Sequence, residues 1–236
     1  MRRALVVGGV GSAYAALHAL GRRAGSTRAE RAAAMAGDAL VPCPQMRTDH
    51  AITIDAPPSE VWPWLTQMGW HLAGWYTPRW VDRLLFPDNW SSLEALDPHL
   101  VRDLRVGDTI PDGRPGTAHY VVAEVERPYR LVLRSTTHVP PGWDVRYGVE
   151  LVWTWSFQLS GMPGARTRAH LRVRARGRPW WFIALYDAGI VPADYVMATG
   201  MLRGLKRRVE AGSAPRVSGR APLRTTDPEP RERTGD

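Results

Sequence analysis

The chain has 236 residues, 44% of them hydrophobic, which is enough for one domain with a sizeable apolar core. Its formal charge is +8, but residues 32–202 hold 16 basic and 17 acidic side chains, so the excess lies at the two ends. A nucleic-acid binder carries its basic residues on a folded face, so this distribution argues against that class. Cys43 is the only cysteine, which excludes an internal disulfide and fits a reducing compartment.

Residues 4–20 form an apolar segment without charged side chains, flanked by Arg2–Arg3 and Arg22–Arg23. This length is close to the shortest helix that crosses a bilayer, at a rise of about 1.5 Å per residue. More arginines follow the segment than precede it, so the positive-inside rule would keep the rest of the chain in the cytoplasm. We therefore predict that residues 1–23 are a membrane anchor or a leader helix. The protein is expected to be membrane-anchored with its domain facing the cytoplasm, or cytoplasmic.

Two other interpretations of this segment are weaker. Residues 34–36 have the small-x-small form of a signal-peptide cleavage site, but charged residues separate them from the apolar run. Gly9 and Gly11 resemble the first two glycines of a dinucleotide-binding turn, yet Tyr14 occupies the third position and no βαβ pattern follows. Residues 24–49 are expected to be a linker.

The folded domain is expected to open with a strand that leads directly into a helix. Ile52 and Ile54 alternate with polar residues, which is the pattern of a strand with one buried face. The double proline at 57–58 ends the strand and can open a helix, because a first-turn residue needs no N–H donor. Apolar residues at three- and four-residue spacing over 61–68 predict that this helix packs on the sheet, and a second short helix is expected over 79–86.

Two alternating segments, 117–126 and 129–137, predict a tight hairpin joined at Arg127-Pro128. Strict alternation places His119 on the inner face of the first strand. The expected cross-strand pairs are Glu126 with Arg130, Val121 with Ser135, and His119 with Thr137.

A second hairpin is predicted from residues 149–160 and 166–176. The inner face of its first strand carries large apolar residues, namely Leu151, Trp153, Trp155, Phe157 and Leu159. Its second strand alternates arginine with apolar residues, and we expect the arginine row to be a solvated sheet face rather than an anion site. The expected pairs are Glu150 with Arg176 and Trp155 with Leu171.

The period becomes helical from residue 180 to residue 210. Pro192 should kink or divide this helix, because its ring removes one hydrogen bond and clashes with the preceding turn. Beyond it, residues 211–236 are rich in Pro, Arg, Gly and Thr and have no aromatic residue, so this tail is predicted to be disordered.

Several of these segments carry the motifs of a known family. They are ITIDAPPSEVWPWL at 52–65, GWYTPRWVDRLL at 74–85, LRVGDTIPDG at 104–113, TWSF at 154–157 and IVPADYVMATGMLRGLKRR at 190–208. On these motifs the chain resembles the SRPBCC superfamily (START-like, helix-grip), which contains polyketide cyclases, lipid-transfer START domains and the birch-pollen allergen fold. The motifs are most similar to a poorly characterised, actinobacterial-type branch of it.

The resemblance implies an α+β helix-grip fold over residues 50–210. Its curved antiparallel sheet of about six or seven strands wraps around a long C-terminal helix, with two short helices after the first strand. It also implies a cavity between sheet and helix that binds a hydrophobic small molecule or lipid. We expect no metal, no cofactor and no nucleic acid. Aromatic residues with a few polar groups among them are how such sites are built. The candidate ligand-binding residues are Trp75, Tyr76, Trp80, His119, Ser135, Thr137, Trp153, Trp155 and Tyr195.

Catalysis has little support in the sequence. The chain has no GxSxG nucleophile elbow and no two histidines at metal-ligand spacing. The alternative to ligand binding is a polyketide cyclase/dehydratase-like enzyme. His119 would be its general acid/base. A further alternative is an interaction protein that presents the Trp-Trp-Phe sequence at 180–182 to a membrane or a partner.

Overall fold

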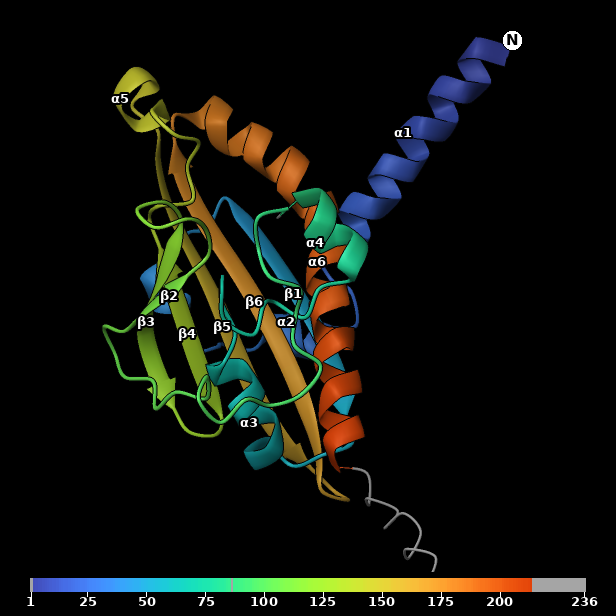
Figure 1. Cartoon of the computed structure of the whole chain (residues 1–236). Coiled ribbons are helices and arrows are strands. Elements are labelled where there is room, and N and C mark those ends of the chain that lie inside the picture. The colour runs from blue at the N-terminus through green and yellow to red at the C-terminus, as the bar shows by residue number, and fades with distance from the viewer. Residues whose placement is uncertain (1, 86, 214–236) are drawn as a thin grey trace, which may run out of the picture.

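Within residues 2–85 and 87–213, which the computed structural model describes, six antiparallel strands form one curved sheet with a long helix on its concave side (Figure 1). In spatial order the strands are β1 (Met46–Ile54), β6 (Arg166–Arg178), β5 (Glu150–Met162), β4 (Arg130–Ser135), β3 (His119–Glu126) and β2 (Thr109–Pro111). The helices are α1 (Arg2–Gly21), α2 (Arg28–Ala32), the 3-10 helix η1 (Asp38–Leu40), α3 (Pro58–Thr66), α4 (Arg79–Leu85), α5 (Trp143–Tyr147) and α6 (Trp180–Ser213).

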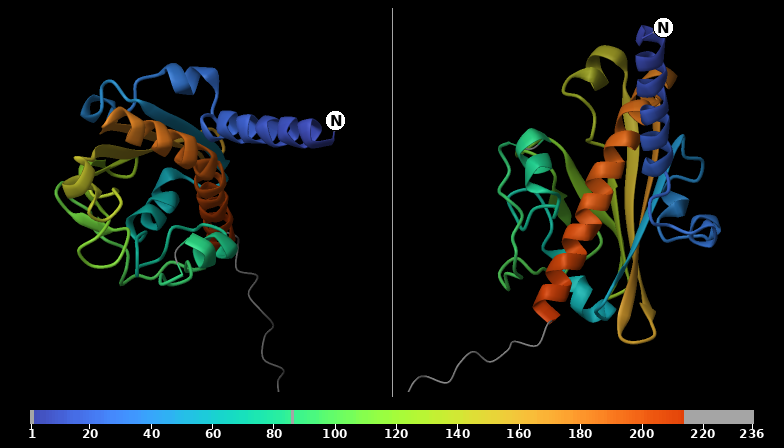
Figure 2. Two further views of the ribbon diagram at one scale, coloured as in Figure 1. Left: turned by 90° about the horizontal axis from the view of Figure 1, so that it is seen from above. Right: turned by 90° about the vertical axis from the view of Figure 1, so that its right-hand side faces the viewer.

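This architecture is the predicted α+β helix-grip fold. The helix α6 packs against β1, β6 and α3, and the view from above shows the sheet curling around α3 and α6 (Figure 2). The helices α3 and α4 follow β1, as expected. Of the tail predicted to be disordered, residues 214–236 lie outside the described residues.

The opening strand and helix form as predicted, but β1 begins at Met46, inside the segment expected to be a linker. Pro58 opens α3, and Val61, Trp64 and Leu65 are buried. The longer strand brings two more side chains, Thr48 and His50, to the inner side, where both contact α6.

A β-bulge in β3 makes the inward assignment of His119 and Val121 wrong. Glu124 pairs with Val132, but Val122 pairs with Leu133, so Ala123 is one residue more than β4 can match. A bulge of this kind turns the strand beyond it to the other face. Tyr120 and Val122 are therefore buried at 1% and 0% exposure, whereas Val121 is 36% exposed and pairs with Arg134 instead of Ser135.

The second hairpin forms with a register two residues from the expected one. Glu150 pairs with Arg178, and Trp155 pairs with Val173 instead of Leu171. The strands run on to Met162 and Arg166, which leaves a turn of only three residues. A shift of two keeps every side chain on its predicted face, because strands have a period of two.

The arginine row of β6 is not a solvated face, because residues 22–45 cover much of it. Arg172 is 1% exposed and donates to the Asp49 carboxylate at 2.7 Å and the Asp38 carboxylate at 2.8 Å. Arg168 pairs with Glu30 of α2 at 2.6 Å. The segment expected to be a linker is thus an ion-paired layer on the convex side of the sheet.

The C-terminal half of α1 is attached to α6 next to Pro192. The Tyr14 hydroxyl donates to the carbonyl of Ala188 at 2.8 Å, the carbonyl that a residue other than proline at 192 would bond. A Cβ on Gly21 would lie 1.9 Å from the carbonyl oxygen of Val191, so only glycine permits this approach. The rest of α1 projects away from the sheet (Figures 1 and 2).

The structure does not support the predicted membrane anchor at residues 4–20. The helix itself forms, but among the described residues no helix combines the length and apolar character needed to cross a bilayer.

Candidate functional site

A space of about 290 Å³ lies between the sheet and α6, and we call it the inner cavity. Its walls come from the loop before α4, the edge strands, β5 and the middle of α6. The lining residues are Trp75, Thr77, Asp112, Ala118, Tyr120, His138, Trp153, Trp155, Tyr186, Ile190, Ala193, Asp194, Met197, Ala198 and Met201.

Five aromatic side chains hold one another in place around the inner cavity. Trp155 lies edge-on to Trp75 with ring centroids 5.4 Å apart, and its ring centroid is 5.3 Å from that of Tyr120. Trp153 lies edge-on to Tyr186 of α6 at 5.5 Å. The two edge-to-face pairs are favourable arrangements of aromatic rings, so they stabilise this wall.

A carboxylate and an imidazole meet at the sheet-edge side of the cavity. Asp112, just after β2, lies 2.8 Å from His138 Nε2, and Ser135 Oγ lies 2.7 Å from His138 Nδ1. Burial raises the pKa of the Asp112 carboxyl above its ordinary value, although the contact with His138 acts in the opposite direction. Both ring nitrogens of His138 are therefore engaged by protein groups.

A second carboxylate enters the cavity from α6. Asp194 is 5% exposed, and its Oδ2 accepts from the Thr48 hydroxyl at 2.6 Å and lies 2.9 Å from His50 Nε2. The His50 side chain is fully buried, and its Nδ1 has no hydrogen-bond partner. Asp112 and Asp194 thus come from the sheet edge and from the helix.

The two tyrosines of the cavity are neutral phenols at physiological pH. Burial raises the pKa of Tyr120 well above its ordinary value, and the negative charges of Asp112 and Asp194 raise it further. Burial also raises the pKa of Tyr186, and the same two carboxylates add to the effect. Neither hydroxyl can serve as a base near neutral pH.

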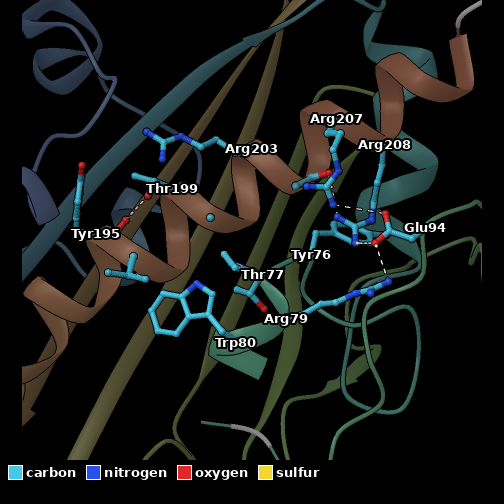
Figure 3. A pocket seen from close by; sticks show the side chains of 14 residues that line it. Tyr76, Thr77, Arg79, Trp80, Glu94, Tyr195, Thr199, Arg203, Arg207 and Arg208 are labelled. Carbon is cyan, nitrogen blue, oxygen red and sulfur yellow. Dashed lines mark hydrogen bonds and ion pairs between the residues drawn. The ribbon is translucent and has the colours of Figure 1, made fainter. Parts of the chain in front are cut away.

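The nine predicted site residues fall into three places. Trp75, Trp153 and Trp155 line the inner cavity. Tyr76, Trp80 and Tyr195 line a separate pocket between the loop before α4 and the opposite face of α6, which Figure 3 shows together with Arg203, Arg207 and Arg208.

The remaining three lie at the edge of the sheet. His119 and Thr137 line a groove outside the cavity, and the His119 backbone N–H donates to Thr137 Oγ1 at 2.9 Å. Ser135 is buried beside His138 and lines neither space. Ala118 and His138 line both the groove and the inner cavity, so the two spaces adjoin there.

The sequence prediction missed Asp112, Tyr120, His138, Tyr186 and Asp194. Asp194 carried a usable signal, because it lies on the same helical stripe as the buried Val191 and Ala198. Asp112 and His138 are 26 residues apart, and no local pattern relates them.

The polar groups do not form a recognisable catalytic arrangement. Ser135, His138 and Asp112 are linked in series, but Ser135 does not reach the cavity and also accepts the backbone N–H of Thr137 at 3.1 Å. Among the residues that the structure describes, no group of three or more His, Cys, Asp or Glu could hold a metal ion.

No family model matches the sequence, and no curated protein matches it. Among solved structures, protein NE0264 from Nitrosomonas europaea is 16% identical, with a TM-score of 0.42 over 71% of this chain and 96% of that one. The Aha1 dimer from Colwellia psychrerythraea is 18% identical, with a TM-score of 0.39 over 72% and 99%. CalU16 from Micromonospora echinospora is 20% identical, with a TM-score of 0.31 over 70% and 84%. Similarity at this level assigns no function to the chain.

Proposed function

We propose that this protein belongs to the SRPBCC superfamily and binds a small, ring-containing apolar molecule in the inner cavity. The observation that carries the proposal is a cavity of about 290 Å³ with five aromatic side chains in its wall. This space equals the liquid volume of about ten water molecules at about 30 Å³ each. It therefore suits a compact ligand rather than a long-chain lipid.

Filling the cavity tests the proposal. Ala193 of α6 lines it, so Ala193→Phe should occupy the space and abolish the binding of n-butylbenzene, a neutral probe of suitable size, in calorimetry. Ala184→Phe places the same side chain on an exposed position of the same helix and should leave binding unchanged. Equal binding by wild type and a folded Ala193→Phe protein would contradict the proposal.

A ligand that co-purifies from the native host should be seen by native mass spectrometry with wild type and Ala184→Phe but not with Ala193→Phe. The alternative, an enzyme that uses His119, receives no support from the geometry, because His119 lines the outer groove.

A further inference from the structure

The ionisable side chains around the inner cavity include two carboxyl groups but no lysine or arginine. The carboxyl groups, those of Asp112 and Asp194, reach it from opposite sides. The one lining residue that can carry a positive charge is His138, which is bound to Asp112 and Ser135.

Asp194 is a buried carboxylate that pairs with no lysine or arginine among the described residues. Among the described residues its single ion-pair partner is His50, which is charged only if protonated. The other donor to Asp194 is the neutral hydroxyl of Thr48.

Buried carboxylates are ordinarily paired with a cation, because desolvation of an unpaired charge is expensive. The side of Asp194 that is not occupied by Thr48 and His50 meets the cavity rather than another protein charge. A cation that compensates Asp194 would therefore lie in the cavity itself.

The aromatic wall of the cavity would also attract a cation. A cation within about 6 Å of an aromatic ring centroid is attracted by the negative face of the ring, most strongly by tryptophan, and cages of such rings recognise ammonium groups. Three tryptophans and two tyrosines line this cavity together with Asp194. An anionic ligand would meet Asp194 and no lysine or arginine in the lining.

We propose that the ligand is an organic cation: a compact amine or quaternary ammonium compound with an apolar ring, whose charged group lies next to Asp194 and whose ring lies among the tryptophans. This inference rests on the proposed binding function and narrows it to a ligand class. The carboxylate of Asp194 is the principal recognition group, and Asp112 contributes from the opposite side.

Two probes of the same shape and different charge test the inference. Benzyltrimethylammonium carries a positive nitrogen where neopentylbenzene has a neutral carbon, so their affinities isolate the effect of charge. In calorimetry we expect wild type to bind the cation at least ten-fold more tightly than the neutral probe. This comparison needs no mutant and cannot be confused with a folding defect.

Substitution of the carboxylate identifies the group responsible. Asp194→Asn keeps the shape and an acceptor oxygen, and it should weaken cation binding at least ten-fold while leaving neopentylbenzene binding unchanged. Asp187→Asn is the matched control, because Asp187 lies on the same helix but pairs with His18 and Arg22 outside the cavity. Its affinities should equal those of wild type.

Failure of the cation inference can be distinguished from failure of the proposed binding function. If wild type binds neopentylbenzene as tightly as benzyltrimethylammonium, the cation inference is wrong and the binding function stands. If the cation binds more tightly but a folded Asp194→Asn protein shows no loss, the assignment to Asp194 is wrong. If neither probe nor n-butylbenzene binds, the proposed function fails and the inference fails with it.

Discussion

Replacing Arg172 with methionine should destabilise the fold by about 3–5 kcal/mol, because it removes one partner of a buried ion-pair network. The Arg172 side chain is 1% exposed and that of Asp49 is 3% exposed, and their ion pair spans 2.7 Å. The same guanidinium donates to Asp38 and to the carbonyls of Ala33 and Glu30 at 2.8–3.0 Å. Methionine fills part of the volume but removes the donor to the carbonyls of Ala33 and Glu30 and one of the donors to each carboxylate.

For a protein of this size each kcal/mol lowers Tm by about 2–4 °C, so Tm should fall by about 6–20 °C. Urea unfolding followed by tryptophan fluorescence measures the change in free energy. Arg176→Met is the control, since Arg176 is an exposed residue on the same face of β6, and it should change stability by less than about 0.5 kcal/mol. A loss below about 1 kcal/mol for Arg172→Met would refute the view that residues 22–45 are held to the sheet by this network.

Three further predictions concern acid stability, helix packing and His119. A hydrogen bond from Arg168 lowers the pKa of Glu30 to about 2. Burial alone would raise the pKa of Asp49, but hydrogen bonds from His170, Arg47 and Arg172 outweigh it and lower the pKa. Both ionised groups therefore stabilise the fold above their unfolded pKa values, and the free energy of unfolding should fall as the pH drops from about 4.5 to about 2. The fall should be less steep in Glu30→Gln. Urea midpoints measured across that pH range would show the difference. Gly204→Ala should strongly destabilise the protein in thermal unfolding, because its Cβ would lie 2.0 Å from the Tyr76 carbonyl oxygen, whereas Gly212→Ala, with nothing within 4 Å, should be neutral or stabilising by up to about 1 kcal/mol. His119→Phe should leave n-butylbenzene affinity within two-fold of wild type, and a larger change would show that the outer groove contributes to binding.

Local patterns predicted the parts of the site that lie on regular strands. Alternation identified Trp153 and Trp155 as inward-facing, and the structure confirms that they line the cavity even though the strand register differs by two. The helical period identified α6, and this helix runs without a break from Trp180 to Ser213 with Pro192 inside it.

The remaining parts depend on contacts between distant residues. The bulge at Ala123 has no sequence signal within β3, because the surplus residue is defined only by the pairing with β4. The burial of Arg172 depends on Asp38, which is 134 residues away, and alternation alone cannot distinguish a covered polar face from a solvated one. Asp194 could have been found, because a carboxylate on an otherwise apolar helical stripe needs an explanation.

Because of the bulge, β3 should tolerate the deletion of one residue. Removal of one residue from a strand ordinarily reverses the orientation of all residues on one side of the gap. Here Ala123 is the residue without a counterpart, so its removal would restore regular pairing and keep both Val122 and Tyr120 pointing inward. The same strand would turn His119 and Val121 towards the inner cavity only if Ala123 were retained and the bulge lost. The way in which β3 accommodates Ala123 thus decides whether Tyr120 or His119 faces the inner cavity.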